Sequence, residues 1–344
     1  MRGSRSMNIL AVESSCDETA VSIVRDGREV LCDCIASQVD LHKIYGGVVP
    51  EIASRMHIEA IYGLADQALA ETGLTRDDID AVAVTYAPGL IGAVLVGVNF
   101  AKAAAMAMNK PLIPVHHIRG HIAANYIAYP ELKPPFLCLV VSGGHTMIVN
   151  VKDYTDMEIL GTTLDDAAGE CFDKVARVLG MPYPGGAALD KAARNGDPSR
   201  YDLPRSKPGA NPYDMSFSGL KTAALNLIHH AEQVGEELDV ASLCAAFSQA
   251  VSDTLVPRVV RALEETGCRK IAVAGGVAAN SRIRQDITAA ADKLGAEVYM
   301  PPLKLCGDNG AMIGAQAYYE YQAGNVADMS LNAYATKSIL GEAL

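Results

Sequence analysis

The sequence predicts a duplicated α/β fold, in which a strand hairpin followed by helices and strands occurs twice. In the first hairpin, the apolar runs Ile9–Val12 and Ala20–Val24 flank a turn of hydroxyl and carboxyl side chains. In the second, Phe136–Val141 and Met147–Val151 flank a small polar turn. Apolar runs around a short polar turn are typical of hairpins. With 50% hydrophobic residues and 30 glycines among 344 residues, the composition suits helices packed closely on sheets.

The elements that follow each hairpin are predicted from hydrophobic spacing. Apolar residues at helical spacing predict helices, and short unbroken apolar runs predict buried strands. After the first hairpin we expect a helix, a strand, a helix and a strand, at Pro50–Leu69, Ile79–Thr85, Gly89–Met108 and Leu112–Val115. After the second hairpin we expect three helices, at Leu164–Leu179, Leu220–Gln233 and Ala241–Thr266. A strand at Lys270–Ala274 then leads through two glycines into a further helix. A short strand at Glu297–Met300 and a last helix at 310–322 complete the chain of expected elements. Tyr201–Pro212, rich in proline and glycine, is expected to be a surface loop.

Length and composition exclude several classes of protein. A chain of 344 residues corresponds to roughly two domains, and its apolar content excludes disorder for most of it. Coiled coil, collagen and antibody-like sandwich are excluded as well. The eight cysteines include no CxxC pair, which indicates reduced thiols rather than a disulfide framework or a cysteine metal site. With a formal net charge of −11, binding to nucleic acid would need a local basic patch or a basic partner.

We expect a cytoplasmic location without a membrane span. The most apolar stretch, Gly89–Ala101, is interrupted by Asn99 and followed by Lys102, which makes it shorter than the ~18 residues that a span requires. Residues 1–6 have no hydrophobic signal region behind them and resemble a vector-encoded leader ahead of a native Met7. We therefore leave residues 1–6 out of the fold.

Two glycine pairs follow buried strands. Ser142-Gly143-Gly144 forms the second hairpin turn, and Gly275-Gly276 ends a strand just before a helix. Glycines let backbone N–H groups approach a phosphate closely, and a helix start favours negative charge. Neither pair fits the Walker or GxGxxG patterns, and each pair taken alone is better explained as a simple tight turn. Two such pairs in a duplicated fold favour a nucleotide.

A metal site is indicated by two histidines. His117 and His121 are four residues apart, so on a helix both imidazoles project from one face. Ile118 stands where the HExxH motif of zinc proteases has its Glu, which weakens a protease interpretation. Asp308, at the start of the last helix, is a candidate third ligand, and two His with one carboxylate suit iron or zinc. From spacing alone, a capping or packing role for the two histidines stays open.

Acidic and basic side chains offer further candidates. Acids that would serve as a general base, a hydroxyl ligand or a Mg²⁺ ligand are Asp17, Glu18, Asp165, Asp166, Glu170, Asp173 and Asp190. The most basic part of this acidic chain lies between residues 190 and 221 and is interspersed with aromatic residues. Such a stretch would contact RNA phosphates and a splayed base, although a solvated loop is the plainer interpretation.

Short motifs along the chain resemble one family. They are Glu13–Thr19 (ESSCDET), Tyr45–Arg55 (YGGVVPEIASR), Pro88–Leu90 (PGL), His116–His121 (HHIRGH), Ser142–Thr146 (SGGHT), Phe217–Lys221 (FSGLK), Gly275–Asn280 (GGVAAN) and Gly307–Gly310 (GDNG). Together they are similar to the bacterial tRNA N6-adenosine threonylcarbamoyltransferase family, once described as a sialoglycoprotein endopeptidase family. The resemblance covers residues 7 to about 322.

The resemblance implies an actin/Hsp70/sugar-kinase-like fold of two lobes with a central nucleotide cleft. We expect an N-terminal lobe at 7–115, a C-terminal lobe at 116–310, and a final helix and tail at 311–344 that return to the N-terminal lobe. The implied reaction moves the threonylcarbamoyl group from threonylcarbamoyl-adenylate to N6 of the adenosine 3′ of the anticodon, in tRNAs reading codons that begin with A. AMP is released.

The resemblance also implies roles for particular residues. His117, His121 and Asp308 would hold one Fe²⁺ or Zn²⁺, and Asp17 and Glu18 match an acidic turn that assists the reaction. The adenylate or an adenine nucleotide, with or without Mg²⁺, would be bound by Val140, Val141, Ser142, Gly143, Gly144, Asp173, Gly186, Asp190 and Asn280. For tRNA, the basic stretch offers Arg205, Lys207 and Lys221. Implied partners are an inactive paralogue that forms a heterodimer, a small P-loop ATPase and a separate synthase that supplies the adenylate.

Other functions fit the residues less well. A small-molecule kinase of the same superfamily would share the glycine loops but would have no need of the two histidines and Asp308. A non-catalytic paralogue or an ATP-gated binding protein would be expected to lack the histidine pair. The sequence leaves open which metal is bound and which carboxylate is the base.

Overall fold

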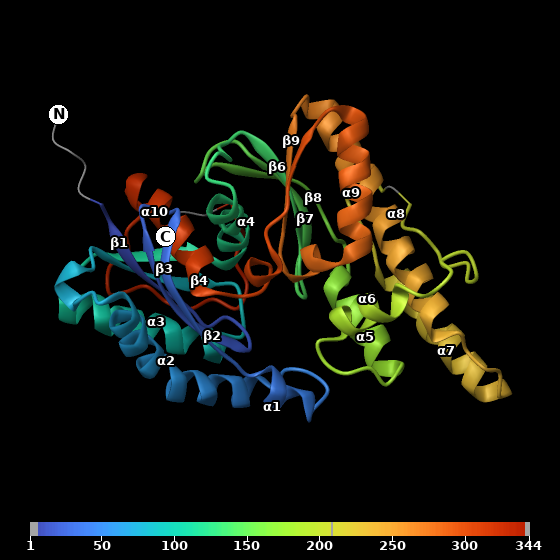
Figure 1. Ribbon diagram of the computed structural model, residues 1–344, viewed down its shortest axis with the longest axis horizontal. Coiled ribbons are helices and arrows are strands. Elements are labelled where there is room, and N and C mark those ends of the chain that lie inside the picture. Colours follow the sequence, from blue (N-terminus) through green and yellow to red (C-terminus); the bar gives the residue numbers. More distant parts are fainter. Residues whose placement is uncertain (1–5, 208, 341–344) are drawn as a thin grey trace. The chain divides into compact units, whose positions relative to one another are not determined.

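A computed structural model describes residues 6–207 and 209–340, which form two compact units (Figure 1). The first comprises the chain up to Pro134, Asp153–Met157 and the chain from Gly307 onwards; the second comprises Pro135–Lys152 and Glu158–Cys306. The division differs from the expected boundary between residues 115 and 116, because the helix that follows residue 116 packs on the last helix of the chain. The expected leader lies outside the described residues except for Ser6.

The first unit is built on a five-stranded sheet in the order β3-β2-β1-β4-β5. Its strands are β1 (Asn8–Glu13), β2 (Glu18–Arg25), β3 (Glu29–Ser37), β4 (Ala81–Ala87) and β5 (Leu112–His116). The hairpin expected at the start is present, because β1 pairs antiparallel with β2. On its other side β1 pairs parallel with β4, and β4 pairs parallel with β5. The turn after β1 therefore lies in the middle of this sheet.

Helices cover both faces of this sheet. They are α1 (Val39–Lys43), α2 (Pro50–Thr72), α3 (Ile91–Met108), α4 (His117–Ala128) and α10 (Gly310–Gln322), with a 3₁₀ turn η1 at Arg76–Asp78. Leu10 and Val12 of β1 pack in one core with residues of α2 and α3. Figure 1 shows these two helices on the same side of the sheet. The opposite face meets α10, where a Cβ added at Gly314 would lie 2.6 Å from Val24 and 3.3 Å from Ala11.

The second unit has a sheet in the order β10-β9-β6-β7-β8. Its strands are β6 (Phe136–Val141), β7 (Thr146–Val151), β8 (Met157–Thr162), β9 (Lys270–Ala274) and β10 (Glu297–Tyr299). Again the first strand pairs antiparallel with the second and parallel with a later one. Read from β8, the order repeats that of the first sheet, which confirms the predicted duplication.

The helices of the second unit pack on one face of its sheet. They are α5 (Ala168–Val178), α6 (Gly185–Ala193), α7 (Ser218–Val234), α8 (Val240–Thr266) and α9 (Ser281–Leu294), with 3₁₀ turns η2 (Gly276–Ala279) and η3 (Leu303–Leu305). Leu137 and Leu139 of β6 share a core with α5, α8 and α9, and the rings of Phe172 and Phe247 meet edge to face at 5.3 Å.

By length and composition alone, α3 qualifies as a membrane span, despite Asn99 and Lys102. Its residues Ala93, Gly97 and Ala101 recur every four positions and are buried in the core. That spacing is typical of a helix packed along one face on a sheet.

Candidate active site

Helix α4 places His117 and His121 side by side. The helix begins where β5 ends, and His116 caps its first turn by accepting a hydrogen bond from the N–H of Ile118 at 3.2 Å. One turn separates the two histidines, so both imidazoles project from one face. Their Nε2 atoms are 3.1 Å apart, and both side chains are buried.

Asp308 is positioned by the start of α10. Asn309 caps this helix through its side chain, which accepts a hydrogen bond from the N–H of Met312 at 2.8 Å. The next residue, Gly310, lies so close to β2 that an added Cβ would be 2.8 Å from the backbone nitrogen of Ser22. The helix start therefore lies directly on the sheet, and Asp308 is held two residues before it.

Two imidazoles and one carboxylate converge at this point. Oδ1 of Asp308 lies 3.1 Å from Nε2 of His121 and 3.5 Å from Nε2 of His117. Ligand atoms placed tetrahedrally at the usual zinc distances are roughly 3.3 Å apart, so these separations fit one metal ion. The structure thus brings together the three residues that the sequence proposed as ligands, and the donor set suits iron or zinc.

A buried carboxylate adjoins this group. Glu13 ends β1, and its Oε2 lies 3.0 Å from Nδ1 of His117. Burial raises the pKa of Glu13, but the adjacent imidazole outweighs burial and holds that pKa below its usual value. Burial lowers the pKa of His117, but the carboxylates of Asp308 and Glu13 outweigh it and raise that pKa to about 9. Sequence reasoning did not select Glu13; a charged residue closing an apolar strand was the available signal.

The acidic turn after β1 is held by α2. His57 donates from Nε2 to the carbonyl oxygen of Cys16 at 2.9 Å, and its Nδ1 accepts from the Thr19 hydroxyl at 2.7 Å. Within this turn Asp17 is buried. Burial and the neighbouring Asp17 carboxylate raise the pKa of Glu18 to about 9, so Glu18 is neutral at pH 7.

The residues expected to bind nucleotide lie in the second unit. Val140 and Val141 end β6, and Ser142, Gly143 and Gly144 form the turn into β7. Both glycines are exposed, and an added Cβ at either would meet nothing within 4 Å. The turn therefore has open space around its backbone, as a ligand-binding loop requires.

The other expected nucleotide residues make local hydrogen bonds. Asp173 accepts from the N–H of Gly186 at 3.1 Å, which joins α5 to the start of α6. Asp190 accepts from the N–H and the hydroxyl of Ser281, at 2.9 and 2.7 Å. Asn280 caps α9 by accepting from the N–H of Ile283. The structure thus brings Asp173 together with Gly186, and joins Asp190 to the start of α9, next to Asn280.

The three basic residues expected to contact tRNA differ in their surroundings. Arg205 pairs with Asp253 at 3.0 Å, and Lys221 forms a short ion pair with Asp166. Lys207 is exposed in the loop between these anchors. Two of the three cations are therefore already neutralised by nearby carboxylates.

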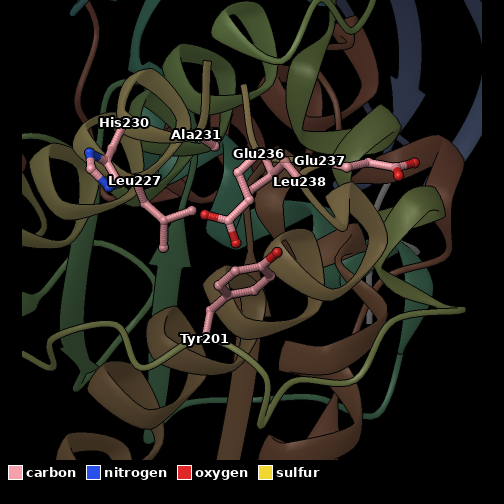
Figure 2. A pocket seen from close by; sticks show the side chains of 7 residues that line it. All are labelled: Tyr201, Leu227, His230, Ala231, Glu236, Glu237 and Leu238. Carbon is pink, nitrogen blue, oxygen red and sulfur yellow. The ribbon is translucent and has the colours of Figure 1, made fainter. Parts of the chain in front are cut away.

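A small cavity lies apart from all of these residues in the second unit (Figure 2). Its volume is about 80 Å³, far below the roughly 300–1,000 Å³ of small-molecule sites. It is lined by the end of α7, the loop after it and Tyr201, namely Tyr201, Leu227, His230, Ala231, Glu236, Glu237 and Leu238.

Solved structures share this fold. Full-length HypF, in a phosphate- and nucleotide-bound form, superposes with a TM-score of 0.62 and 16% identity over 92% of this chain and 46% of that chain. Component A of (R)-2-hydroxyglutaryl-CoA dehydratase from Acidaminococcus fermentans gives 0.52 and 14% over 92% and 98%. These likenesses confirm the actin/Hsp70/sugar-kinase-like fold that the family resemblance implied.

Relatives of much higher identity specify the family. A family model described as tRNA N6-adenosine threonylcarbamoyltransferase matches residues 29–315. The enzyme of that name from Moorella thermoacetica is 55% identical over 326 residues, 95% of each chain. One from Clostridium botulinum is 53% identical over 328 residues, 95% of this chain and 96% of that one. Identity of this extent over nearly the whole length shows that the chain belongs to the tRNA N6-adenosine threonylcarbamoyltransferase family, whose members are tRNA-modifying transferases.

Proposed function

We propose that the chain transfers the threonylcarbamoyl group of threonylcarbamoyl-adenylate to N6 of the adenosine 3′ of the anticodon, in tRNAs reading codons that begin with A. The N6 nitrogen attacks the carbonyl carbon of the mixed anhydride, the bond from that carbon to the phosphate oxygen breaks, and AMP leaves. One N6 proton is lost to a base. Among the structural observations, the convergence of His117, His121 and Asp308 carries this proposal, because a kinase on the same fold would not need it.

In this proposal His117, His121 and Asp308 hold one Fe²⁺ or Zn²⁺. A bound ion of this kind would supply Lewis-acid polarisation of a carbonyl or phosphate oxygen of the donor. The protein contributes the fixed geometry: α4 holds both imidazoles, and α10 holds the carboxylate. Because the donor is already activated, catalysis consists mainly of positioning and of stabilising negative charge.

The acidic turn supplies the proton acceptor in this proposal. The amine of adenine is a weak nucleophile and must lose a proton as its new bond forms, which a positioned carboxylate accelerates. We assign this role to Asp17, and we assign to Glu18 the role of its neutral neighbour. A pKa of about 9 for Glu18 supports this division, because at pH 7 its carboxyl group donates a hydrogen bond rather than accepting a proton.

The second unit binds the adenylate in this proposal. The backbone N–H groups of the turn at Val140–Gly144 would approach the phosphate, and the open space around Gly143 and Gly144 supports that role. Asp173, Gly186, Asp190 and Asn280 would bind the rest of the nucleotide, with or without Mg²⁺. The hydrogen bonds of Asp173 with Gly186 and of Asp190 with Ser281 would keep this surface preformed.

tRNA is the macromolecular substrate of the family. We assign a phosphate-contacting role to Arg205, Lys207 and Lys221, with most of the affinity supplied by partners because the chain is acidic. By resemblance these partners are an inactive paralogue that dimerises with the chain and a small P-loop ATPase, while a separate synthase supplies the adenylate. The proposed location is the cytoplasm.

Reconstitution tests the proposed reaction. The purified chain is combined with the synthase, threonine, bicarbonate, ATP, the partners and unmodified tRNA, and the digested nucleosides are analysed by mass spectrometry. We expect threonylcarbamoyladenosine in the complete reaction and none when this chain is omitted. In the same assay His117→Ala, His121→Ala and Asp308→Ala should each lose bound metal and product while keeping the parent circular dichroism. Full metal occupancy in all three variants would remove this group from the mechanism.

A further inference from the structure

Glu13 is a charged residue in the interior of the first unit. It is the last residue of β1, and its side chain is 0% exposed. A buried carboxylate costs free energy unless hydrogen-bond donors surround it. Glu13 has such donors on both oxygens, and one of its neighbours is a proposed metal ligand.

The partners of Glu13 come from three elements. Its Oε1 accepts a hydrogen bond from the backbone N–H of Ser15, in the turn after β1. Its Oε2 accepts from the Thr85 hydroxyl of β4 at 2.6 Å and lies 3.0 Å from Nδ1 of His117 on α4. Because a backbone N–H can only donate, Ser15 fixes Oε1 as an acceptor, and Oε2 is left to the other two groups.

This contact determines which nitrogen of His117 carries a proton. A metal ion binds the neutral form of histidine, which has lost one of the two imidazolium protons and keeps one N–H. A carboxylate oxygen facing Nδ1 favours keeping that proton on Nδ1, so the proton lost to the metal is the one on Nε2. The Nε2 lone pair then points toward Nε2 of His121 and Oδ1 of Asp308. The Ser15 hydroxyl, 3.2 Å from Nδ1, can donate or accept and so imposes no tautomer.

The other histidine, His121, has no comparable contact at its Nδ1 within the described part of the chain. Its Nδ1 is buried without a hydrogen-bond partner among the residues that the structure describes. We infer that Glu13 is a positioning residue, which fixes the Nδ1-protonated tautomer of His117 and thereby leaves Nε2 free to bind metal. The inference rests on the proposed metal site, and it assigns to Glu13 the carboxylate role that often supports a metal-binding histidine.

An isosteric substitution separates this role from packing. In Glu13→Gln the carbonyl oxygen must face the N–H of Ser15, because turning the amide round would oppose two donors. The NH₂ group then faces Nδ1 of His117 and Thr85. An NH₂ group donates to an unprotonated Nδ1, so the His117 proton moves to Nε2 and blocks metal binding. The side chain keeps its volume and its hydrogen bond to Ser15.

Thr85→Val is the matched control. It also removes one buried hydrogen bond of Glu13, but it leaves the carboxylate facing Nδ1 of His117. Parent, Glu13→Gln, Thr85→Val and His121→Ala are stripped with a chelator, and their Zn²⁺ affinity is measured by competition with a chromophoric chelator. Melting temperatures are recorded in the metal-free state.

We expect Glu13→Gln to bind Zn²⁺ about 10–100-fold more weakly than the parent, and Thr85→Val to stay within about threefold. Metal-free melting temperatures of these two variants should be similar. Equal Zn²⁺ affinity of Glu13→Gln and the parent would overturn the inference, as would equal losses in Glu13→Gln and Thr85→Val. If the parent binds no Zn²⁺, or if His121→Ala binds it as well as the parent, the proposed metal site itself fails.

Discussion

The carboxylate of Asp33 accepts a hydrogen bond from the backbone N–H of Gly310, 277 residues later in the chain, at 3.1 Å. It also accepts from Ala311 at 3.2 Å. Asp33 lies on β3, and these two N–H groups open α10, which begins two residues after the proposed metal ligand Asp308. A side chain of the sheet therefore fixes the helix start that holds Asp308.

Asp33→Ala should weaken metal binding without touching a ligand. Loss of a cap costs ~1 kcal/mol, which is roughly 2–4 °C in Tm for a unit of about 150–250 residues that unfolds cooperatively. With its helix start released, Asp308 should also lose its fixed position, and we expect Zn²⁺ affinity to fall about tenfold or more. Calorimetry measures the change in Tm, and chelator competition measures the change in Zn²⁺ affinity.

The matched control is Asp239→Ala. Asp239 caps α8 in the second unit by accepting from the N–H of Ser242 at 3.1 Å. The Asp239→Ala variant should lower Tm by a similar amount and leave Zn²⁺ affinity at the parent value. Asp33→Asn should retain most of the parent's Tm and Zn²⁺ affinity. Equal metal affinity in Asp33→Ala and Asp239→Ala would show that the cap does not position Asp308.

Much of this fold follows from local sequence pattern. Both hairpins and the long helices have apolar periodicities that only one structure satisfies, and the four-residue spacing of His117 and His121 predicted their shared helix face. The pairing of Asp33 with the start of α10 lies beyond local pattern, because it joins segments 277 residues apart. Glu13 was missed for the same reason, since its partner His117 lies 104 residues away.

Helix α6 and the start of α5 show where local pattern fails. Helix α6 begins with two glycines after Pro184, which predict a turn, but packing against α5 and α8 makes the segment helical. Helix α5 begins at Ala168 rather than at 164. Asp165 instead accepts hydrogen bonds from the N–H groups of Phe217 and Ser218 and so caps α7.

The two acids of the turn should respond differently to amide substitution. Asp17→Asn removes the proposed proton acceptor, and we expect kcat to fall by about 10²–10⁴. Glu18→Gln replaces a carboxyl group that is already neutral at pH 7 by another neutral hydrogen-bond donor, and its kcat should fall by less than about tenfold. Single-turnover transfer to tRNA measures both. Comparable losses in the two variants would contradict the division of roles.

The raised pKa of Glu18 predicts a pH-dependent stability. In the unfolded chain Glu18 ionises near its ordinary pKa of 4.5, whereas in the folded protein it keeps its proton up to about pH 9. Its contribution to stability is therefore present below pH 4.5 and is lost as pH rises toward 9. Glu18→Gln has no carboxyl group at this position and therefore does not lose stability in this way. The Tm of the variant minus the Tm of the parent should increase from pH 5 to pH 8.5.

Thermal melts of the metal-free proteins measure this difference. Each kcal/mol corresponds to roughly 2–4 °C, and we expect a gain of at least ~1 kcal/mol at pH 8.5. Glu131→Gln, at an exposed position, serves as the control and should show the same offset at both pH values. A constant offset for Glu18→Gln would mean that Glu18 titrates normally in the folded protein.

Gly143→Val should block nucleotide binding while leaving the fold intact. An added Cβ at Gly143 meets nothing within 4 Å, so we expect the protein to accommodate the valine without a change in its circular dichroism. With the circular dichroism unchanged, a loss of binding is assigned to contact between the valine and the ligand. We expect AMP or ATP to bind more than tenfold weaker, which corresponds to about 1.4 kcal/mol. Calorimetry measures the affinity for AMP or ATP. Gly209→Val, equally unobstructed but in the surface loop, should bind like the parent.

The basic loop provides a test of tRNA contact. Replacing Arg205 and Lys207 with Glu reverses both charges and should raise the KM for tRNA, most clearly at low salt. Each lost phosphate contact lowers by about one the slope of log affinity against log salt concentration. Consumption of the adenylate without tRNA should stay at the parent level. Steady-state kinetics at two salt concentrations, with partners held constant, measure both quantities.

The ion pair of Arg205 with Asp253 calls for a control, because reversing Arg205 also releases this anchor of the loop. Asp253→Asn breaks the same pair but keeps both cations. If the loop contacts tRNA phosphates, Asp253→Asn should keep or lower KM, since it removes the nearer of the two carboxylates that pair with Arg205 and leaves only the longer pair with Asp202. The double reversal should raise KM. If instead the anchored loop conformation is what matters, both variants raise KM to the same extent and with the same salt slope. A KM unchanged by the double reversal at both salt concentrations would assign the RNA surface to the partners.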